Sequence, residues 1–469
     1  MFIRICLFLV MLLSGGVQAQ SRISAEERLF GLAMLWKEAS YNFAYFDQVP
    51  DLDWDATYQA FIPKVLAAKS DYQYYKVLKQ FLATLNDGMS YVQMNHELRN
   101  KHNALPPIML AEAEHQAVVV GISETLASQL PLGSIITHVD GVEVKDKLQQ
   151  EVFPFISSST EHIRWHEGIK GNQGLGYGLL MGQVGTVVKV RFTTPANRAG
   201  HLSMIREADL SGVAWQLASG VMANTHSVVH KVLADNIHYV ALNDFSQDSV
   251  TEQFIKLLPQ LQTANGLVID LRQNRGGNTF VAESILKYLT FHDLLGISSK
   301  MRIHNSTYKA WGKYADQFSW AKKYQDYSSG NAWLKNAPDT LRADDIDKSN
   351  KVVVPTAILT SRETSAAAES FLVYASSARH IMLIGEPTFG STGQPLEIDL
   401  PGGGRATICS KRETFADGRD FVGIGIQPDV YVPRDIEYYF SKHDKTLSSA
   451  TEWLGKQGEL AQATASNMH

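Results

Sequence analysis

The spacing of hydrophobic positions divides the chain into stretches of different periodicity. In the first stretch, apolar residues recur at helical spacing and aromatic residues are frequent. Ser24 followed by Glu27 forms a capping-box pattern at the start of the stretch, and Asp87 with Gly88 ends it. Three helices are predicted, over residues 24–45, 54–68 and 71–85. We therefore expect an N-terminal helical domain over residues 20–104.

The helical periodicity then gives way to short β-like runs. Such runs, separated by glycine, proline and polar residues, are typical of strands joined by turns. Strands are predicted over residues 117–122, 134–139 and 186–193. We therefore expect a β-domain over residues 105–206.

Strand-like runs between residues 207 and 437 are apolar throughout. Two examples are residues 266–271 and 352–359, each followed by small residues and then by a helical pattern. Continuous apolar runs are typical of parallel strands that are buried on both faces. The predicted fold class is therefore a multidomain α/β protein, in which the helical domain and the β-domain precede an α/β core of β-α-β units.

Two further segments differ from this core. Residues 295–350 are aromatic and charged, with Trp311, Trp320 and Trp333 among them, and show little apolar alternation. We expect this segment to be an insertion over the cleft of the core, either a lid or an interaction surface. Residues 438–469 are predicted to form a C-terminal helix and tail.

Composition narrows the class of protein. The chain has 469 residues, of which 45% are hydrophobic and 19% are charged, which is typical of a globular protein. Its net charge of −5, with no run rich in Lys and Arg, disfavours a nucleic-acid partner, because phosphate binding needs clustered positive charge.

The first 19 residues have the pattern of a secretory signal peptide. Arg4 precedes an apolar run over residues 5–13, and small residues lead to Ala19, where cleavage is predicted. We expect the mature protein to be exported, either to the periplasm or to the medium. No later run reaches the length that a membrane-spanning helix needs.

Cysteine and histidine residues offer two further chemistries, both disfavoured. Cys409 would be the single cysteine of the mature chain, and it lies in an alternating run that predicts a buried strand residue better than a thiol nucleophile. His162 and His166 are four residues apart and could bind zinc from one helix face, but no Glu stands at the metalloprotease spacing. Solvent-facing histidines in a loop are the favoured interpretation. No metal or other cofactor is expected.

The segment between strand and helix at residues 364–371 is the candidate active-site turn. A buried strand that leads through small residues into a helix presents backbone N–H groups and one side chain to a cleft. The segment resembles the catalytic core of the S41 serine peptidases, a family that includes the C-terminal processing proteases. Within this family, the resemblance is closest to the tricorn-like and retinoid-binding-protein-like branch. Three more segments agree in order and spacing, at residues 267–278, 384–395 and 417–429.

The resemblance assigns roles to individual positions. With Glu369 as anchor, the family's nucleophile position falls on Ala366, and Ser365 stands next to it. The glycine turn of Gly276 and Gly277 corresponds to part of the family's oxyanion hole.

The base positions are also substituted. The His of the tricorn-like branch corresponds to Met89, and a thioether cannot act as a general base. The Lys of the processing proteases corresponds to Ser391, and a further Glu of the family corresponds to Val422. The resemblance also implies that residues 105–206 form a PDZ-like module, although the usual Gly-Leu-Gly-Phe loop is not visible.

Two functions are compatible with this sequence. In the first, the chain is an exported S41 homologue that binds extended polypeptide segments or chain termini and is catalytically impaired. In the alternative, it is an active serine endopeptidase that uses Ser365 as nucleophile with a base that the sequence does not identify. The expected partner is a polypeptide in both cases.

Overall fold

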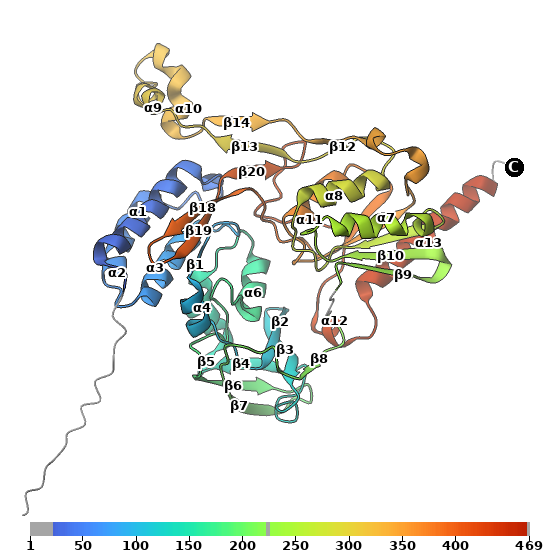
Figure 1. Cartoon of the computed structure of the whole chain (residues 1–469), viewed down its shortest axis with the longest axis horizontal. Coiled ribbons are helices and arrows are strands. Elements are labelled where there is room, and N and C mark those ends of the chain that lie inside the picture. Colours follow the sequence, from blue (N-terminus) through green and yellow to red (C-terminus); the bar gives the residue numbers. More distant parts are fainter. Residues whose placement is uncertain (1–21, 222–225, 467–469) are drawn as a thin grey trace, which may run out of the picture.

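The computed structural model describes residues 22–221 and 226–466 (Figure 1). The predicted signal peptide lies outside the described residues. Among the described residues, no helix combines the length and the apolar character that crossing a membrane requires. The chain forms the predicted mixture of helices and sheets, with helices at the N-terminus, so the predicted fold class is confirmed.

All three predicted N-terminal helices are present. They are α1 (Ala25–Asn42), α2 (Trp54–Leu66) and α3 (Asp71–Ala83), followed by the short helix α4 (His96–His102). The capping box at the start of α1 is formed, because the Ser24 hydroxyl accepts from the Glu27 N–H at 3.1 Å and the Glu27 carboxylate accepts from the Ser24 N–H at 2.7 Å. Aromatic rings hold the helices together, and Trp54 stacks on Phe81 with ring centroids 4.4 Å apart.

The β-domain is an antiparallel sheet with a helix beside its outer strand. Its strands are β2 (Ile108–Ala113), β3 (Gln116–Ser123), β4 (Ile135–Val139), β5 (Val142–Glu143), β6 (Val187–Thr193), β7 (Ala199–Ile205) and β8 (Trp215–Leu217). The order is β2-β3-β4-β6-β7, with β5 on β4 and β8 on β3, so that the three predicted strands are confirmed. Helix α6 (Glu161–Lys170) packs against β2.

The two histidines that we considered as zinc ligands lie in α6, so the prediction of a solvent-facing loop is wrong. His166 is buried, and the ring of His162 is 2.9 Å from the Thr388 carbonyl oxygen. The error arose because Gly171 and the glycines that follow it suggested a loop, whereas the helix ends only at that glycine. Within the described part of the chain, no group of three or more His, Cys, Asp or Glu side chains could hold a metal ion.

A six-stranded sheet forms the core, with the order β21-β17-β16-β11-β10-β9. Its strands are β9 (Val228–Val232), β10 (Ile237–Leu242), β11 (Gly266–Asp270), β16 (Thr356–Thr360), β17 (Ile381–Gly385) and β21 (Val430–Tyr431). All neighbouring strands are parallel except the pair β9 and β10. This is the β-α-β arrangement that the continuous apolar runs predicted.

Helices cover both faces of this sheet, which explains why its strands are apolar throughout. They are α7 (Ser249–Leu261), α8 (Thr279–Leu286) and α11 (Ala367–Ala375) on one face, and α13 (Lys445–Ser466) on the other. Ala450 and Leu454 of α13 pack on Val268 and Leu359, in agreement with the predicted C-terminal helix.

The N-terminal helices share one hydrophobic core with the face of the sheet that α7, α8 and α11 cover. Strand β1 (Tyr91–Gln93) pairs with β19 (Gly404–Cys409), which also pairs with β18 (Pro395–Leu400). Cys409 is fully buried in β19, as predicted. The pairing brings the loop that precedes β1 against the segment that precedes β18, although the two are about three hundred residues apart in sequence.

The predicted insertion is a β-arm with short helices at its end. Strands β13 (Ser298–Arg302) and β14 (Trp333–Asn336) extend the sheet strand β20 (Lys411–Thr414), and β12 (Leu294–Leu295) pairs with β15 (Thr340–Leu341) at the base. The end carries α9 (Ser306–Gly312), η6 (Ser319–Tyr324) and α10 (Gln325–Ser329). This end projects beyond α1 (Figure 1), away from the cavity described below, so its predicted place over the cleft is wrong.

Phe371 offers a test of the packing between α11 and the rest of the core. Its side chain is fully buried and its ring stacks on Phe245, with centroids 5.9 Å apart. We expect Phe371→Ala to lower the free energy of unfolding by about 3–5 kcal/mol, because it removes a buried aromatic side chain and leaves a cavity. Guanidinium denaturation followed by circular dichroism measures the change. Phe291→Ala, at a side chain that is 44% exposed, is the control and should change stability little.

Candidate active site

The candidate turn has the backbone geometry of a nucleophile elbow. Strand β16 ends at Thr360 and α11 begins at Ala367, and between them Ala366 has φ of 52° and ψ of −119°. A positive φ costs a residue with a Cβ about 1–3 kcal/mol, and such strain is concentrated at functional sites. The turn therefore keeps the strained shape that presents one side chain to a cleft, and that side chain is a methyl group.

Ala366, and not Ser365, faces the glycine turn. A Cβ built on Gly276 would lie 2.7 Å from the Ala366 Cβ, so the two backbones approach too closely for any other residue. Gly276 also has φ of 100°, which favours glycine. The structure thus brings together the predicted nucleophile position and the predicted oxyanion glycines.

Backbone N–H groups at this turn differ in their availability. The Gly276 N–H donates to the Asn274 side-chain oxygen at 2.9 Å, so this predicted donor is already occupied. Across residues 22–221 and 226–466, no hydrogen bond is made by the N–H of Gly277 or by that of Ala367. Ala367 is the first residue of α11, where N–H groups lack intrahelical partners and the helix dipole favours negative charge. The prediction of the turn missed Ala367, which its place at a helix start could have indicated.

Ser365 is half-buried and lacks a base. Its N–H donates to the Asn274 carbonyl oxygen at 3.1 Å, and its own carbonyl oxygen accepts from the Ala368 N–H at 3.1 Å. The Ser365 hydroxyl makes no hydrogen bond to a His, Lys, Asp or Glu side chain of the described residues. An unassisted hydroxyl is a weak nucleophile, and this one has no partner to take its proton.

The loop that carries Met89 and the segment that carries Ser391, the two base positions of the family, lie side by side. A Cβ built on Gly88, next to Met89, would lie 3.0 Å from the Ser391 hydroxyl oxygen. Met89 itself packs against the core, and its carbonyl oxygen accepts from the Thr407 hydroxyl at 2.7 Å. Neither position supplies an imidazole or an amine.

A buried carboxyl occupies this region instead. Asp87 is 2% exposed, and its oxygens accept from the hydroxyls of Ser90 at 2.6 Å and Ser391 at 3.5 Å. Burial raises the pKa of Asp87 to about 6, although these hydrogen bonds oppose the rise. The sequence suggested only a turn residue here, because the contact with Ser391 depends on tertiary packing.

Glu369 connects the two halves of the site. One carboxylate oxygen accepts from the Thr388 hydroxyl at 2.5 Å and from the Gly390 N–H at 2.7 Å, while the other accepts from the Ala366 N–H at 3.3 Å. Burial raises the pKa of Glu369 to about 7. Val422, where the family has a Glu, is fully buried and supplies no charge.

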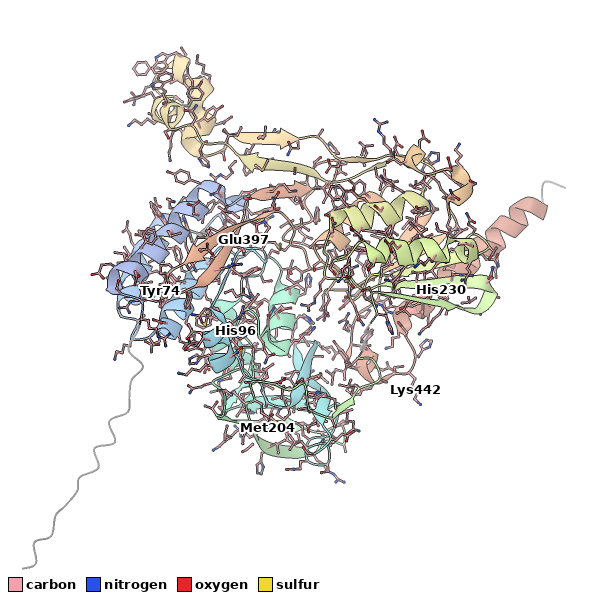
Figure 2. All side chains as sticks on the ribbon, viewed as in Figure 1. Tyr74, His96, Met204, His230, Glu397 and Lys442 are labelled. Atoms are coloured by element: carbon pink, nitrogen blue, oxygen red, sulfur yellow. The ribbon has the colours of Figure 1, made fainter. Side chains whose placement is uncertain are left out.

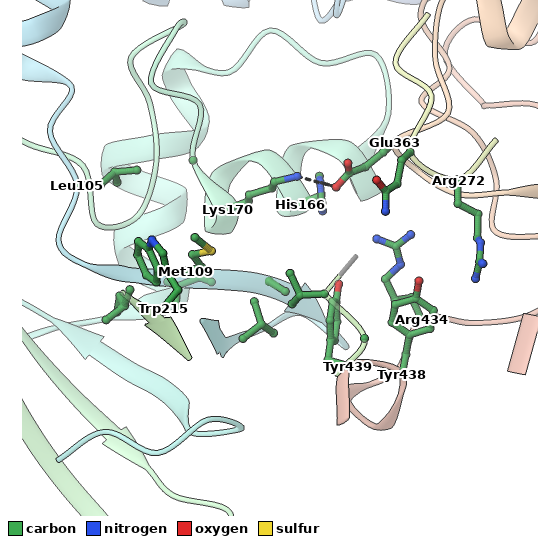
Figure 3. Close-up of a pocket in the computed structure, with 18 of the residues that line it drawn as sticks. Leu105, Met109, His166, Lys170, Trp215, Arg272, Glu363, Arg434, Tyr438 and Tyr439 are labelled. Atoms are coloured by element: carbon green, nitrogen blue, oxygen red, sulfur yellow. Dashed lines mark hydrogen bonds and ion pairs between the residues drawn. The ribbon is translucent and has the colours of Figure 1, made fainter. Parts of the chain in front are cut away.

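A cavity of about 570 Å³ adjoins the turn between α6, β2 and the core (Figure 3). Strand β2 contributes an apolar wall that includes Met109, and the opposite side is polar. The polar lining residues used below are His166, Lys170, Arg272, Glu363, Arg434 and Tyr439. The cavity therefore combines an outer strand, an apolar surface and several cationic side chains.

Glu363, two residues before Ser365, is the acidic group of this lining. Lys170 Nζ lies 2.6 Å from Glu363 Oε1, and His166 Nε2 lies 3.2 Å from the same oxygen. Burial opposes ionisation, but the contacts with His166 and Lys170 hold the pKa of Glu363 well below its usual range. Arg434 makes an ion pair with Glu386 at 3.2 Å and also borders the cavity. Arg272 pairs with Asp270 and Asp444, so each lysine and arginine of the lining already has a carboxylate partner.

The buried Glu369 should make stability depend on pH. Its folded-state pKa of about 7 exceeds its ordinary value of 4.5, so between these values the folded state holds a proton that the unfolded state has lost. The contribution of Glu369 to the free energy of unfolding is therefore fully present below pH 4.5, and it is lost as the pH rises through the folded-state pKa of about 7. Glu369→Gln should flatten this fall, measured as the guanidinium midpoint against pH. Glu97→Gln, at an exposed carboxylate, should leave the profile unchanged.

Three comparisons place this geometry among known proteins. The model of peptidase family S41 matches residues 236–432. A carboxyl-terminal-processing protease of Picosynechococcus sp. is 27% identical over 235 residues, which cover 49% of this chain and 47% of the relative. The chain thus aligns with about half the length of this curated relative.

Solved structures agree with the fold over most of the chain. The crystal structure of mature CPAF is 15% identical, with a TM-score of 0.69, and the match covers 94% of this chain and 98% of that one. A putative peptidase from Parabacteroides merdae is 16% identical, with a TM-score of 0.51, and the match covers 92% and 96% of the two chains. The match over residues 236–432 covers the β-α-β core, and this part of the chain is similar to the peptidases of family S41.

Proposed function

We propose that this chain is an exported S41 homologue that binds extended polypeptide segments or chain termini and is catalytically impaired. The observation that carries the proposal is the methyl group of Ala366 at the apex of the strained turn, facing Gly276. A serine peptidase needs both a nucleophile and a base within hydrogen-bond reach. Loss of both leaves only the residual catalysis of an oxyanion hole and binding, roughly 10³ to 10⁴ over water.

The cavity supports the binding part of the proposal. Strand β2 is the outer strand of its sheet, and an outer strand can accept an extended segment through its unpaired backbone groups. Met109 and Trp215 offer apolar surface for alternate side chains of such a segment. In PDZ-like modules a peptide is added along an open edge in this manner, and here the edge leads toward the candidate turn.

Cationic side chains around the same cavity favour a chain terminus over an internal segment. Lys170 and Arg434 border the cavity near its polar end, beside His166, whose pKa is lowered by burial. Lys170 and His166 both contact the Glu363 carboxylate. The terminal carboxylate of a bound peptide would lie beside this carboxylate and share the contact with Lys170. Capture by side chains would replace the glycine-rich carboxylate loop that the sequence lacks.

The alternative, an active endopeptidase that uses Ser365, gives a different result in a casein assay. We expect the mature chain from Gln20 to leave labelled casein uncut, because position 366 lacks a hydroxyl and no base is adjacent. The double variant Ala366→Ser with Met89→His should gain cleavage by about a hundredfold or more over the natural chain, within the range of a positioned nucleophile and base. Ala366→Ser with Ser391→Lys tests the other family base position.

Ser365→Ala is the matched control for this assay. It should change nothing in the natural chain or in the double variant. Cleavage by the natural chain that is abolished by Ser365→Ala would overturn the impaired-enzyme proposal and establish the alternative.

Peptide binding is tested separately from cleavage. We expect Lys170→Ala to weaken binding of a fluorescent apolar peptide with a free C-terminal carboxylate by about fivefold, since one charge-assisted contact is lost. Binding of the same peptide with an amidated C-terminus should change little. Fluorescence anisotropy gives both affinities, and Lys145→Ala, at an exposed lysine outside the cavity, is the control.

Equal losses for the two peptides would show that Lys170 does not contact a terminal carboxylate. The absence of binding by either peptide would contradict the binding part of the proposal.

A further inference from the structure

The end of the β-arm exposes a group of aromatic side chains. We define the tip as residues 303–332, which connect β13 to β14. Its aromatic residues are Tyr308, Trp311, Tyr314, Phe318, Trp320, Tyr324 and Tyr327. Four of them are exposed, at 42% for Trp311, 39% for Tyr314, 49% for Phe318 and 52% for Trp320. Exposed apolar surface of this kind marks an interaction site.

His304, at the start of the tip, meets the edge of Tyr41 in α1 with ring centroids 5.0 Å apart, whereas the Trp, Tyr and Phe rings of the tip contact one another. Phe318 stacks on Trp320 with centroids 5.9 Å apart, and Trp311 meets the edge of Tyr324 at 5.1 Å. Helices α9, η6 and α10 likewise pack on one another. The tip is therefore a small aromatic unit of its own, and its exposed rings are not the margin of the main core.

The arm holds this unit away from the rest of the molecule. Figures 1 and 2 show the tip at the end of β13 and β14, beyond the N-terminal helices and on the far side from the C-terminal helix α13. A projecting tip can contact an extended surface before the body of the protein does. Its position leaves the cavity between α6 and β2 open to solvent and to polypeptides.

The charge of the tip is opposite to that of the whole chain. The tip has two aspartates, no glutamate or arginine, and four lysines, which are Lys309, Lys313, Lys322 and Lys323. Its net charge is therefore +2, whereas the net charge of the whole chain is −5. All four lysines are exposed. Lysine is depleted at the core of protein–protein interfaces, whereas Trp and Tyr together with Lys are enriched where proteins meet lipid headgroups.

We propose that the tip docks on the surface of an anionic lipid bilayer. The rings of Trp311, Phe318 and Trp320 enter the interface between headgroups and acyl chains, and the four lysines contact the anionic headgroups. Both attractions are needed, because the apolar surface is small and the local charge is modest. The contact is peripheral, and it is independent of whether the S41 core cuts or only binds its polypeptide.

Vesicle binding tests this proposal with the chain from Gln20. We expect co-sedimentation with vesicles of phosphatidylcholine and phosphatidylglycerol at least about tenfold stronger than with phosphatidylcholine alone, and a marked loss at high salt. The triple variant Trp311→Ser, Phe318→Ser and Trp320→Ser should weaken binding by about tenfold or more. Phe291→Ser, at a ring that is 44% exposed on the body, should bind as the natural chain does.

Two further measurements test the lipid contact without the triple variant, whose loss of binding could also follow from misfolding. Brominated lipids should quench the tryptophan fluorescence of the natural chain, and Trp311→Phe with Trp320→Phe should lose this quenching while binding persists. Reversal of the four tip lysines to glutamate should abolish the preference for anionic vesicles.

Equal binding to both kinds of vesicle, or none to either, would overturn the proposal. So would a dimer in light scattering that the triple variant dissociates while the vesicles stay unbound, because the tip would then be an interface between two copies of this chain.

Discussion

The buried carboxyl group of Glu369 is the contact on which the candidate site depends. It receives the Ala366 N–H on one side and the Thr388 hydroxyl and Gly390 N–H on the other. A carboxyl without water needs such partners, because burial without hydrogen bonds costs several kcal/mol, on the order of the whole net stability of a domain. Through this one side chain, the strained turn is fixed relative to the segment that would carry the base.

The site therefore keeps its shape without its reactive groups. Ala366 holds a positive φ that a residue with a Cβ adopts at a cost, and Gly276 lies against it where no other side chain fits. The region of the base positions contains the Asp87 carboxyl with two hydroxyls in place of an imidazole or an amine. A scaffold that retains such strain and such close packing still forms a shaped surface, which is what binding a polypeptide requires.

Organisation around the shared core also explains how distant segments form one surface. The N-terminal helices and the α/β sheet bury a single hydrophobic cluster, and the pairing of β1 with β19 sets the register between them. The cavity lies where α6 and β2 of the β-domain approach the turn at Glu363, and the lining combines residues from all three of these elements. The arm with its aromatic tip extends from the opposite side of this assembly.

The sequence by itself determined the class of the fold, the N-terminal helices, the buried parallel strands and the identity of Ala366 at the turn, because these follow from local periodicity and from motifs within short segments. It failed at His162 and His166, whose helix is followed by glycines that suggested a loop, and it missed Asp87 and the N–H of Ala367. Only the tertiary structure decided that Ala366 rather than Ser365 faces Gly276, and that Ser90 and Ser391 converge on the buried carboxyl of Asp87. Such contacts join residues hundreds of positions apart, and they depend on how strands pair and helices pack, which no local pattern specifies.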